Sequence, residues 1–498
     1  MITYSMPSFR VQPLRAMGRT FAAVLCIALL GCVQTAPYRV TSISPEQVMC
    51  DPDASGAVPA ACASYMREHA TQYDLLFTEF DDQGWANNPH KIDDPILNTM
   101  QAGPSDQTKE FGNLKAFLNE QSTKLQPLLI ITFVHGWKHN ASTDDANVKL
   151  FRLVQEKTAK KETDARTGRR VVGVYVGWRG DSLELTDGLK SVLTFYDRKG
   201  TADKVSKGAI HEVIVYLNAY ERKVNEDAGT KCDRASASGP VGCPVVSVFI
   251  GHSFGGLILY EAIAPTVLSS IIDAEMHGDE DDPSNAKRFG DTVLLINPAI
   301  EAVRFQPLFR SVATYQPKKY RPPLMVMLTT SADVATGTFF PIGRFFSTFF
   351  EKKNSTPEQY DATLETIGHM KPYLTHYLHN FGNTPPGNVA HSPGHWPRLF
   401  GPGNVLYVCN SKYAAYPVWN IETDESVMTG HSDLANDNLR EFVVALIDDA
   451  IVKPERMKNL PAQQMEAESL QGVDNVPIDC LSSDNYERLD PEHTKKSN

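Results

Sequence analysis

The sequence VVSVFIGHSFGGL, residues 245–257, decides the fold. Its first six residues are apolar apart from Ser247, which is typical of a strand with both faces buried in a parallel sheet. The pentapeptide Gly-His-Ser-Phe-Gly follows at once, and the apolar run from Leu257 begins a helix. A serine at such a strand-to-helix turn presents its hydroxyl at the sheet edge, and the flanking glycines let neighbouring backbone approach. The stretch therefore predicts an α/β sheet that carries Ser253 as a nucleophile.

The same apolar texture recurs along the chain and alternates with helical patterns. Strands are expected at 73–80, 128–134, 171–176, 245–250, 292–296, 324–328 and 404–408. Helices are expected at 108–121, 202–223, 256–275 and 438–448. This alternation predicts the α/β fold class, with a mostly parallel, doubly wound sheet in one large domain.

Composition excludes several classes of protein. With 42% apolar residues, the 498-residue chain can bury a substantial core and is not disordered as a whole. Its net charge of −11 argues against broad nucleic-acid binding, which depends on neutralising phosphates. The eight cysteines include no Cys-x-x-Cys pair, which argues against a zinc ribbon or a thioredoxin-type site. We expect no cofactor.

The first 32 residues have the pattern of an export signal. Residues 1–20 contain three arginines and no acidic residue, and the apolar run at 21–31 is too short to span a bilayer. Its end, Leu-Leu-Gly-Cys, resembles the lipobox of bacterial lipoproteins, in which the cysteine is lipidated. We therefore expect a signal peptide at 1–31 and a lipid anchor on Cys32. Val33 after the cysteine favours the outer over the inner membrane of the envelope, and an ordinary secretory signal is the alternative.

Export to an oxidising compartment changes the interpretation of the six remaining cysteines. Their even number favours disulfides over buried thiols. Local spacing favours two short loops and leaves a third pair by exclusion: Cys50–Cys62, Cys232–Cys243 and Cys409–Cys480.

The chain is expected to divide into four segments. The signal peptide is followed by a Pro-, Ala- and Ser-rich tether and N-terminal extension at 32–69, and a catalytic domain at 70–452 comes next. An insertion at about 350–403 is expected to form a cap within that domain. A polar C-terminal tail occupies 453–498.

Three other features accompany the Ser253 turn. His-Gly-Trp at 135–137 follows an apolar strand, Asp333 follows another, and His431 lies in a loop before the last expected helix. In this order they resemble the α/β-hydrolase superfamily, of the serine esterase/lipase type, over about residues 70–450.

The resemblance implies a Ser-His-Asp triad. Ser253 would attack, His431 would act as its base, and Asp333 would orient the imidazole. Glu301, after the strand at 292–296, is the competing acid. His252 is expected to be a packing residue, because side chains adjacent to the nucleophile diverge from it.

The resemblance also implies an oxyanion hole and its support. The backbone N–H groups of Trp137 and Phe254 would bind the oxyanion. Four further residues would shape the serine turn and the oxyanion loop: Gly251, Gly255, His135 and Gly136.

Other motifs have more ordinary interpretations. The pairs His376/His379 and His391/His395 have loosely metal-like spacing but lack carboxylates or cysteines at ligand spacing, so surface-loop histidines are expected and no metal. Phe pairs between 339 and 350 form either a helix packed on the sheet or an acyl pocket or lid. Arg179 either contacts substrate or pairs with Asp181.

The function that these features predict is hydrolysis of carboxylic esters through an acyl-enzyme, on a small-molecule or lipid acyl ester, at a membrane reached through the lipid anchor. Amidase, peptidase or thioesterase activity would use the same triad. A non-catalytic envelope protein is the remaining alternative.

Overall fold

The computed structural model describes residues 37–41, 48–81, 84, 109–178, 201–228, 243–276, 288–314, 322–339, 356–386, 389, 396–409, 413–414 and 416–450. The expected signal peptide, Cys32, the tail at 453–498 and most of the Phe-rich stretch lie outside these residues.

The described strands form one 11-stranded sheet in the order β1-β2-β4-β3-β5-β6-β7-β11-β8-β10-β9. Every pairing from β2 through β8 is parallel, and only β1, β10 and β9 pair antiparallel, at the two edges. The strands are β1 (Arg67–His69), β2 (Tyr73–Phe80), β3 (Leu128–Val134), β4 (Arg170–Trp178), β5 (Val245–His252), β6 (Thr292–Ile296), β7 (Met325–Thr330), β8 (His376–Asn380), β9 (Arg398–Leu399), β10 (Asn404–Val408) and β11 (Val418–Thr423).

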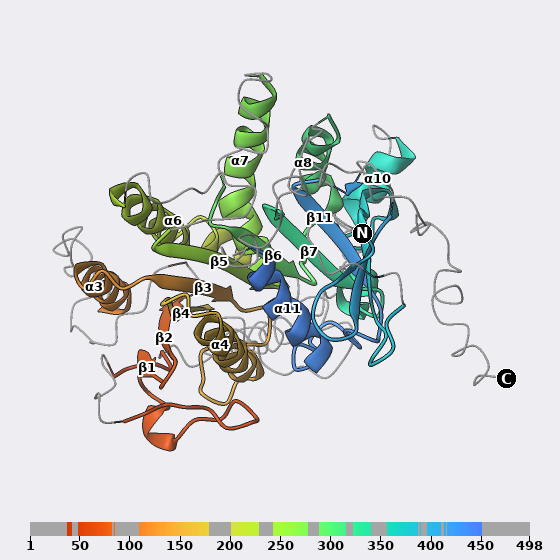
Figure 1. Cartoon of the computed structure of the whole chain (residues 1–498). Coiled ribbons are helices and arrows are strands. Elements are labelled where there is room, and N and C mark those ends of the chain that lie inside the picture. Colours follow the sequence, from red (N-terminus) through yellow and green to blue (C-terminus); the bar gives the residue numbers. More distant parts are fainter. Residues whose placement is uncertain are drawn as a thin grey trace, which may run out of the picture.

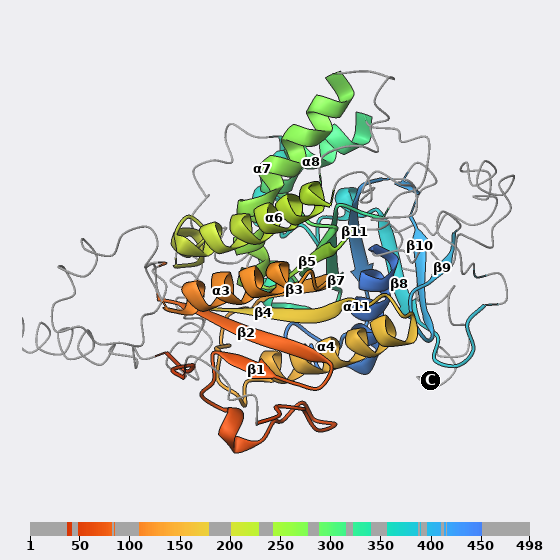
Figure 2. The same ribbon diagram turned by 60° about the vertical axis from the view of Figure 1, so that its left-hand side comes forward.

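Helices cover both faces of the sheet (Figures 1 and 2). One face carries α3 (Lys109–Thr123), α6 (Ala209–Asp227), α7 (Phe254–Met276) and α8 (Ala302–Thr314), with α10 (Pro357–Leu364) beside α8. The other face carries α4 (Ala146–Asp164) and α11 (Asp437–Ala450). Short helical turns occur at η1 (Ala60–Cys62), η5 (Ala335–Phe339) and η7 (Lys371–Tyr373). Two large apolar clusters therefore lie on opposite sides of the strands, as the doubly wound prediction requires.

Burial explains why the central strands could be predicted. Every residue of β2, β3, β5 and β6 is buried. Strands β3 and β6 are nearly continuous apolar runs, whereas β2 also buries Asp74, Thr78 and Glu79. The expected bounds of β2, β3 and β6 are the observed ones. The single helix expected at 202–223 is interrupted in the structure. A turn at 206–208 ends a first helical stretch, and α6 begins after Gly208. The expected strand at 404–408 is β10, an antiparallel strand near the edge.

Strand β11 was not predicted, although it lies between β7 and β8 in the sheet. Its sequence, VWNIET, interrupts the apolar pattern with polar side chains. Asn420 is nonetheless fully buried. Its burial is tolerated because its amide donates to the Ile367 and Tyr373 carbonyls. Glu422 accepts from Lys371. Partners distant in the sequence therefore make this strand possible.

The prediction of a tether is wrong for the described part of 32–69, which packs against the sheet. The fully buried Glu68 binds Arg39 at 2.8 Å and Arg152 of α4 at 2.6 Å. The guanidinium of Arg39 also lies 3.7 Å from the Phe77 ring centroid. A buried ion pair must be well hydrogen bonded to be tolerated, and here both guanidinium groups donate to backbone carbonyls as well as to Glu68.

The disulfide Cys50–Cys62 is confirmed, with an S–S length of 2.11 Å. Cys243 and Cys409 are also disulfide-bonded. Their expected partners, Cys232 and Cys480, lie outside the described residues.

The expected cap at 350–403 is a different structure in its described part. Strand β8 pairs parallel with β11, and β10 and β9 continue the sheet beyond it. The described part of this segment therefore widens the sheet. Its strands form their backbone hydrogen bonds with neighbouring strands of the same sheet.

Helix α7 is long and apolar enough to cross a membrane, but 67% of its most apolar window is buried. It passes over the sheet and projects beyond it (Figure 1). The burial identifies it as a core helix of the fold.

Buried His376 in β8 generates a prediction about stability. Burial lowers its pKa to about 3, and its ring lies against Trp396 and Trp419. Below pH 6.5 the unfolded chain protonates this histidine while the folded chain does not, so the free energy of unfolding should fall by about 1.4 kcal/mol per pH unit from this residue. Urea unfolding between pH 7 and 4.5 should therefore show a shallower pH dependence for His376→Phe than for the wild type. If the free energy of unfolding of both proteins changed equally with pH, His376 would not have the lowered pKa.

Candidate active site

Three side chains meet at the carboxyl edge of the parallel strands. Ser253 follows β5, Asp333 follows β7, and His431 lies in the loop between β11 and α11. His431 Nε2 lies 2.8 Å from Ser253 Oγ, and His431 Nδ1 lies 2.7 Å from Asp333 Oδ2. The three residues proposed from the sequence as a triad are therefore joined by two hydrogen bonds, with the expected base, His431, between the nucleophile and the acid.

Ser253 occupies a sharp turn whose backbone is in the left-handed region, with φ at 55°. Its N–H donates to the Ile296 carbonyl at 2.9 Å, which fixes the turn to the end of β6. Close approach requires the flanking glycines. A Cβ on Gly255 would lie 2.1 Å from the Val134 carbonyl oxygen, and one on Gly251 would lie 2.7 Å from the Gly255 carbonyl oxygen. Such strain is typical of functional turns.

The Asp333 carboxylate is buried, with an exposed fraction of 1%. Burial opposes its ionisation, but the His431 imidazole and hydrogen bonds from His431 and Thr336 outweigh burial and hold the pKa of Asp333 below its usual value. An ionised Asp333 accepts only, so His431 Nδ1 carries the proton of their hydrogen bond. Nε2 of the neutral imidazole is then the acceptor for the Ser253 hydroxyl.

Two further side chains hold the His431 backbone. His252 Nε2 and Asn297 Nδ2 both donate to the His431 carbonyl, at 2.9 and 3.0 Å. His252 is therefore more than the packing residue that the sequence suggested. Burial, followed by the nearby His431 and His139, lowers the pKa of His252 well below its usual value, so it remains a neutral donor.

Asn297 was missed by the sequence analysis. It lies directly after β6 with φ at 44°, and its Oδ1 accepts from the Thr330 N–H at 3.1 Å. It thus ties the ends of β6 and β7 to the His431 loop. The signal that singled out Asp333, a polar residue just beyond a buried strand, also applies to Asn297.

The loop after β3 lies against the serine turn. A Cβ on Gly136 would lie 2.8 Å from Ser253 Cβ, so these two segments are in close contact. The buried His135 accepts from the Trp178 N–H through Nε2 at 2.9 Å and donates from Nδ1 to the Gly136 carbonyl at 2.8 Å. These bonds fix the His135 ring between the loop and β4, and the ring also stacks on Trp178.

Trp137 and Phe254, the expected oxyanion donors, follow Gly136 and Ser253 directly. Trp137 is half-buried, and Lys138 Nζ lies 4.6 Å from its ring centroid. Phe254 begins α7, whose first backbone N–H groups create positive potential beside Ser253. The two segments that would supply the oxyanion donors therefore converge at the nucleophile.

Other expected candidates lie apart from this site. Glu301, the competing acid, forms an ion pair with Arg304 at 2.9 Å, whereas Asp333 is the carboxylate that His431 contacts. The surface-loop prediction is wrong for His376, which is buried, and for His379, which binds Asp424 at 2.6 Å in β8. Within the described residues, no group of three His, Cys, Asp or Glu side chains could hold a metal. Arg179, Asp181, His391 and His395 lie outside the described residues.

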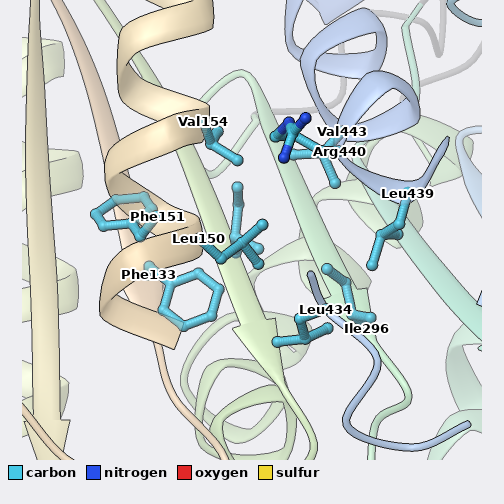
Figure 3. A pocket seen from close by; sticks show the side chains of 10 residues that line it. Phe133, Leu150, Phe151, Val154, Ile296, Leu434, Leu439, Arg440 and Val443 are labelled. Atoms are coloured by element: carbon cyan, nitrogen blue, oxygen red, sulfur yellow. The ribbon is translucent and has the colours of Figure 1, made fainter. Parts of the chain in front are cut away.

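A small apolar cavity of about 10 Å³ lies behind the site, between α4 and α11. Figure 3 shows Phe133 and Phe151 on one side and Leu434, Leu439 and Val443 on the other. This volume is at the lower limit for a single water molecule, so the cavity is a packing gap. Since Leu434 belongs to the loop of His431, the cavity marks where that loop rests on the core.

The fold and the site together define an α/β protein with a hydrogen-bonded Ser-His-Asp set at the carboxyl edge of its sheet. Comparisons of the chain with protein-family models, with curated proteins and with solved structures found no match.

The close packing of the serine turn predicts that alanine at position 255 destabilises the protein, whereas alanine at an open glycine elsewhere stabilises it. Gly255→Ala should lower the free energy of unfolding by about 1–3 kcal/mol, because its Cβ meets fixed backbone. The control is Gly112→Ala in α3, where a Cβ meets nothing within 4 Å; it should raise that free energy by about 1 kcal/mol. Urea unfolding measures both. Equal effects would show that the turn does not constrain position 255.

Proposed function

We propose that this protein is a serine hydrolase of the α/β-hydrolase type that cleaves carboxylic esters. The observation that carries the proposal is the chain of hydrogen bonds from Ser253 Oγ to His431 Nε2 and from His431 Nδ1 to Asp333. The order Ser253, Asp333, His431 along the chain and the position of each after a strand are typical of that superfamily.

The geometry supports a two-step acyl transfer. His431 Nε2 takes the Ser253 proton as Oγ attacks the acyl carbonyl, and Asp333 stabilises the imidazolium that forms. The backbone N–H groups of Trp137 and Phe254 would bind the oxyanion. When the intermediate collapses, His431 returns the proton to the departing alcohol, and the acyl group stays on Oγ. Water, deprotonated by His431, then attacks the acyl carbon. The bond to Ser253 Oγ breaks, Oγ takes the proton back from His431, and the carboxylic acid leaves.

The protonation states at the site suit this chemistry. The lowered pKa of Asp333 keeps its carboxylate charged at neutral pH, as its role requires. His252 stays neutral beside His431, so it adds no positive charge that would oppose protonation of the base. His431 is partly exposed, with 15% of its side chain accessible, whereas Ser253 is buried beneath it.

The test is labelling by a fluorophosphonate probe together with a panel of esters, thioesters and amides of varied acyl length. Ser253→Ala should abolish labelling and lower kcat on the best ester by at least about a thousandfold. Ser432→Ala, a change at an exposed serine on the His431 loop, is the matched control and should label like the wild type. No labelling of the folded wild type would overturn the hydrolase proposal, and faster cleavage of amides or thioesters than of esters would replace the ester assignment.

We also propose that Cys32 carries a lipid anchor that places the protein on the bacterial outer membrane. Arg39 is fixed at the carboxyl edge of the strands, because its N–H donates to Glu79 and its Nε donates to the Ala141 carbonyl beyond β3. Seven residues span at most about 25 Å, so an anchor at Cys32 would hold the active-site edge near the bilayer. This arrangement favours a lipid acyl ester as substrate.

The anchor is tested by expressing the full chain in a bacterium fed an alkyne analogue of palmitate. The wild type should incorporate the label and sediment with the outer membrane. Cys32→Ser should lose the label and become releasable from the envelope, yet keep its activity on a water-soluble ester. Label on the serine variant, or none on the wild type, would overturn the anchor while leaving the hydrolase proposal intact.

A further inference from the structure

The Asp333 carboxylate is held from a second side by Thr336, which lies in η5. The Thr336 N–H donates to Asp333 Oδ1 at 3.0 Å, and its Oγ1 lies within hydrogen-bond distance of Oδ2, the oxygen that also accepts from His431. Thr336 is fully buried. One hydroxyl and one imidazole therefore share a single carboxylate oxygen.

The donor at each link of this network follows from the number of protons. An ionised Asp333 has none to give, so the single hydroxyl proton of Thr336 points to Oδ2. The His369 Nε2 lies 3.1 Å from the same Oγ1. Because that oxygen has already used its proton, it accepts, and His369 is the tautomer with its proton on Nε2.

His369 is fixed in place by a turn at 366–370. Gly368 lies so close to β7 that a Cβ on it would be 1.9 Å from Thr329 Oγ1. The Ile367 N–H donates to the Ile300 carbonyl at 3.0 Å, and the Asn420 amide donates to the Ile367 carbonyl. The turn is thus tied to the segment after β6, to β7 and to β11, and the imidazole lies beside Gly337.

We propose that Thr336 and His369 are positioning residues that extend the triad into the chain His369–Thr336–Asp333–His431–Ser253. The inference rests on the proposed hydrolase function. His369 orients the Thr336 hydroxyl, and that hydroxyl holds Oδ2 of Asp333 in the position from which it accepts the proton of His431 Nδ1. The segment between the acid and the histidine of the triad therefore takes part in building the site.

The network also determines how much negative charge Asp333 presents to His431. A hydroxyl that donates to Oδ2 withdraws negative charge from the carboxylate, and its removal leaves more charge to stabilise the imidazolium. The titratable groups that interact with His431 are Asp333, His252 and His369. Burial lowers the pKa of His369, so it is neutral near pH 7 and its replacement removes a hydrogen bond without removing a charge. Lys371, which also acts on His369, pairs with Glu422.

The experiment measures kcat, KM and the pH profile of kcat/KM on a soluble ester. Thr336→Val should lower kcat about tenfold to a hundredfold, with KM within about threefold, because a buried carboxylate loses a donor. The acid limb of its profile should move to higher pH. Thr336→Ser retains the hydroxyl and should stay near the wild type. His369→Phe should produce a smaller loss with the same direction of shift, and His369→Gln, which keeps an N–H donor, should recover most of it.

A double-mutant cycle tests whether His369 acts through Thr336. The Thr336→Val/His369→Phe double variant should be no slower than Thr336→Val alone. Fully additive losses, or an unmoved acid limb in Thr336→Val and His369→Phe, would overturn the proposal. If circular dichroism shows that Thr336→Val is unfolded, the comparison of His369→Phe with His369→Gln tests the proposal by itself. His369 is partly exposed, so its replacement should leave the protein folded. Failure of the hydrolase proposal is separate, because the folded wild type would then neither label at Ser253 nor cleave the ester.

Discussion

The left-handed backbone of Ser253 is the constraint on which the rest of the site depends. A side chain at φ 55° is tolerated only where its surroundings fix the turn, and here the Ile296 carbonyl accepts the Ser253 N–H while backbone packs against Gly251 and Gly255. The same packing brings Gly136 against Ser253 Cβ. The strained torsion of Ser253 thus requires β3, β5 and β6 to end at the same edge of the sheet. The other polar groups of the site lie at this edge.

Those polar groups are tolerable at the sheet edge because each makes at least one hydrogen bond. A buried polar atom without a partner costs about 1–3 kcal/mol, and Asn297, His252, Asp333 and Thr336 are all almost fully buried. Asn297 and His252 both donate to the His431 carbonyl, whereas Thr336 donates to Asp333. The imidazole of His431 is therefore oriented twice: through its backbone from β5 and β6, and through its ring from β7.

The predictability of each part follows from the range of the interactions that determine it. Strands β3 and β6 could be predicted with their bounds because burial on both faces leaves a nearly continuous apolar run in the sequence itself. Ser253 was predictable because its turn is coded by glycines within two residues. Strand β11 was not, since buried Asn420 depends on carbonyls at Ile367 and Tyr373 about 50 residues away. The packed N-terminal extension escaped prediction for the same reason, because Arg39 looks like a solvent-exposed charge until Glu68 is placed beside it.

The residues missed near the site share this dependence on distant partners. Thr336 and His369 are 33 positions apart, and neither belongs to a recognisable motif. They come together only because of the path that the chain takes into β8. Strand β8 pairs with β11, and the segment just before β8, at Gly368, passes against Thr329 of β7. A segment that looks like an insertion in the sequence is therefore part of the scaffold of the acid. The spacing between Asp333 and His431 reflects this construction: the intervening chain widens the sheet and also supplies the imidazole that orients Thr336.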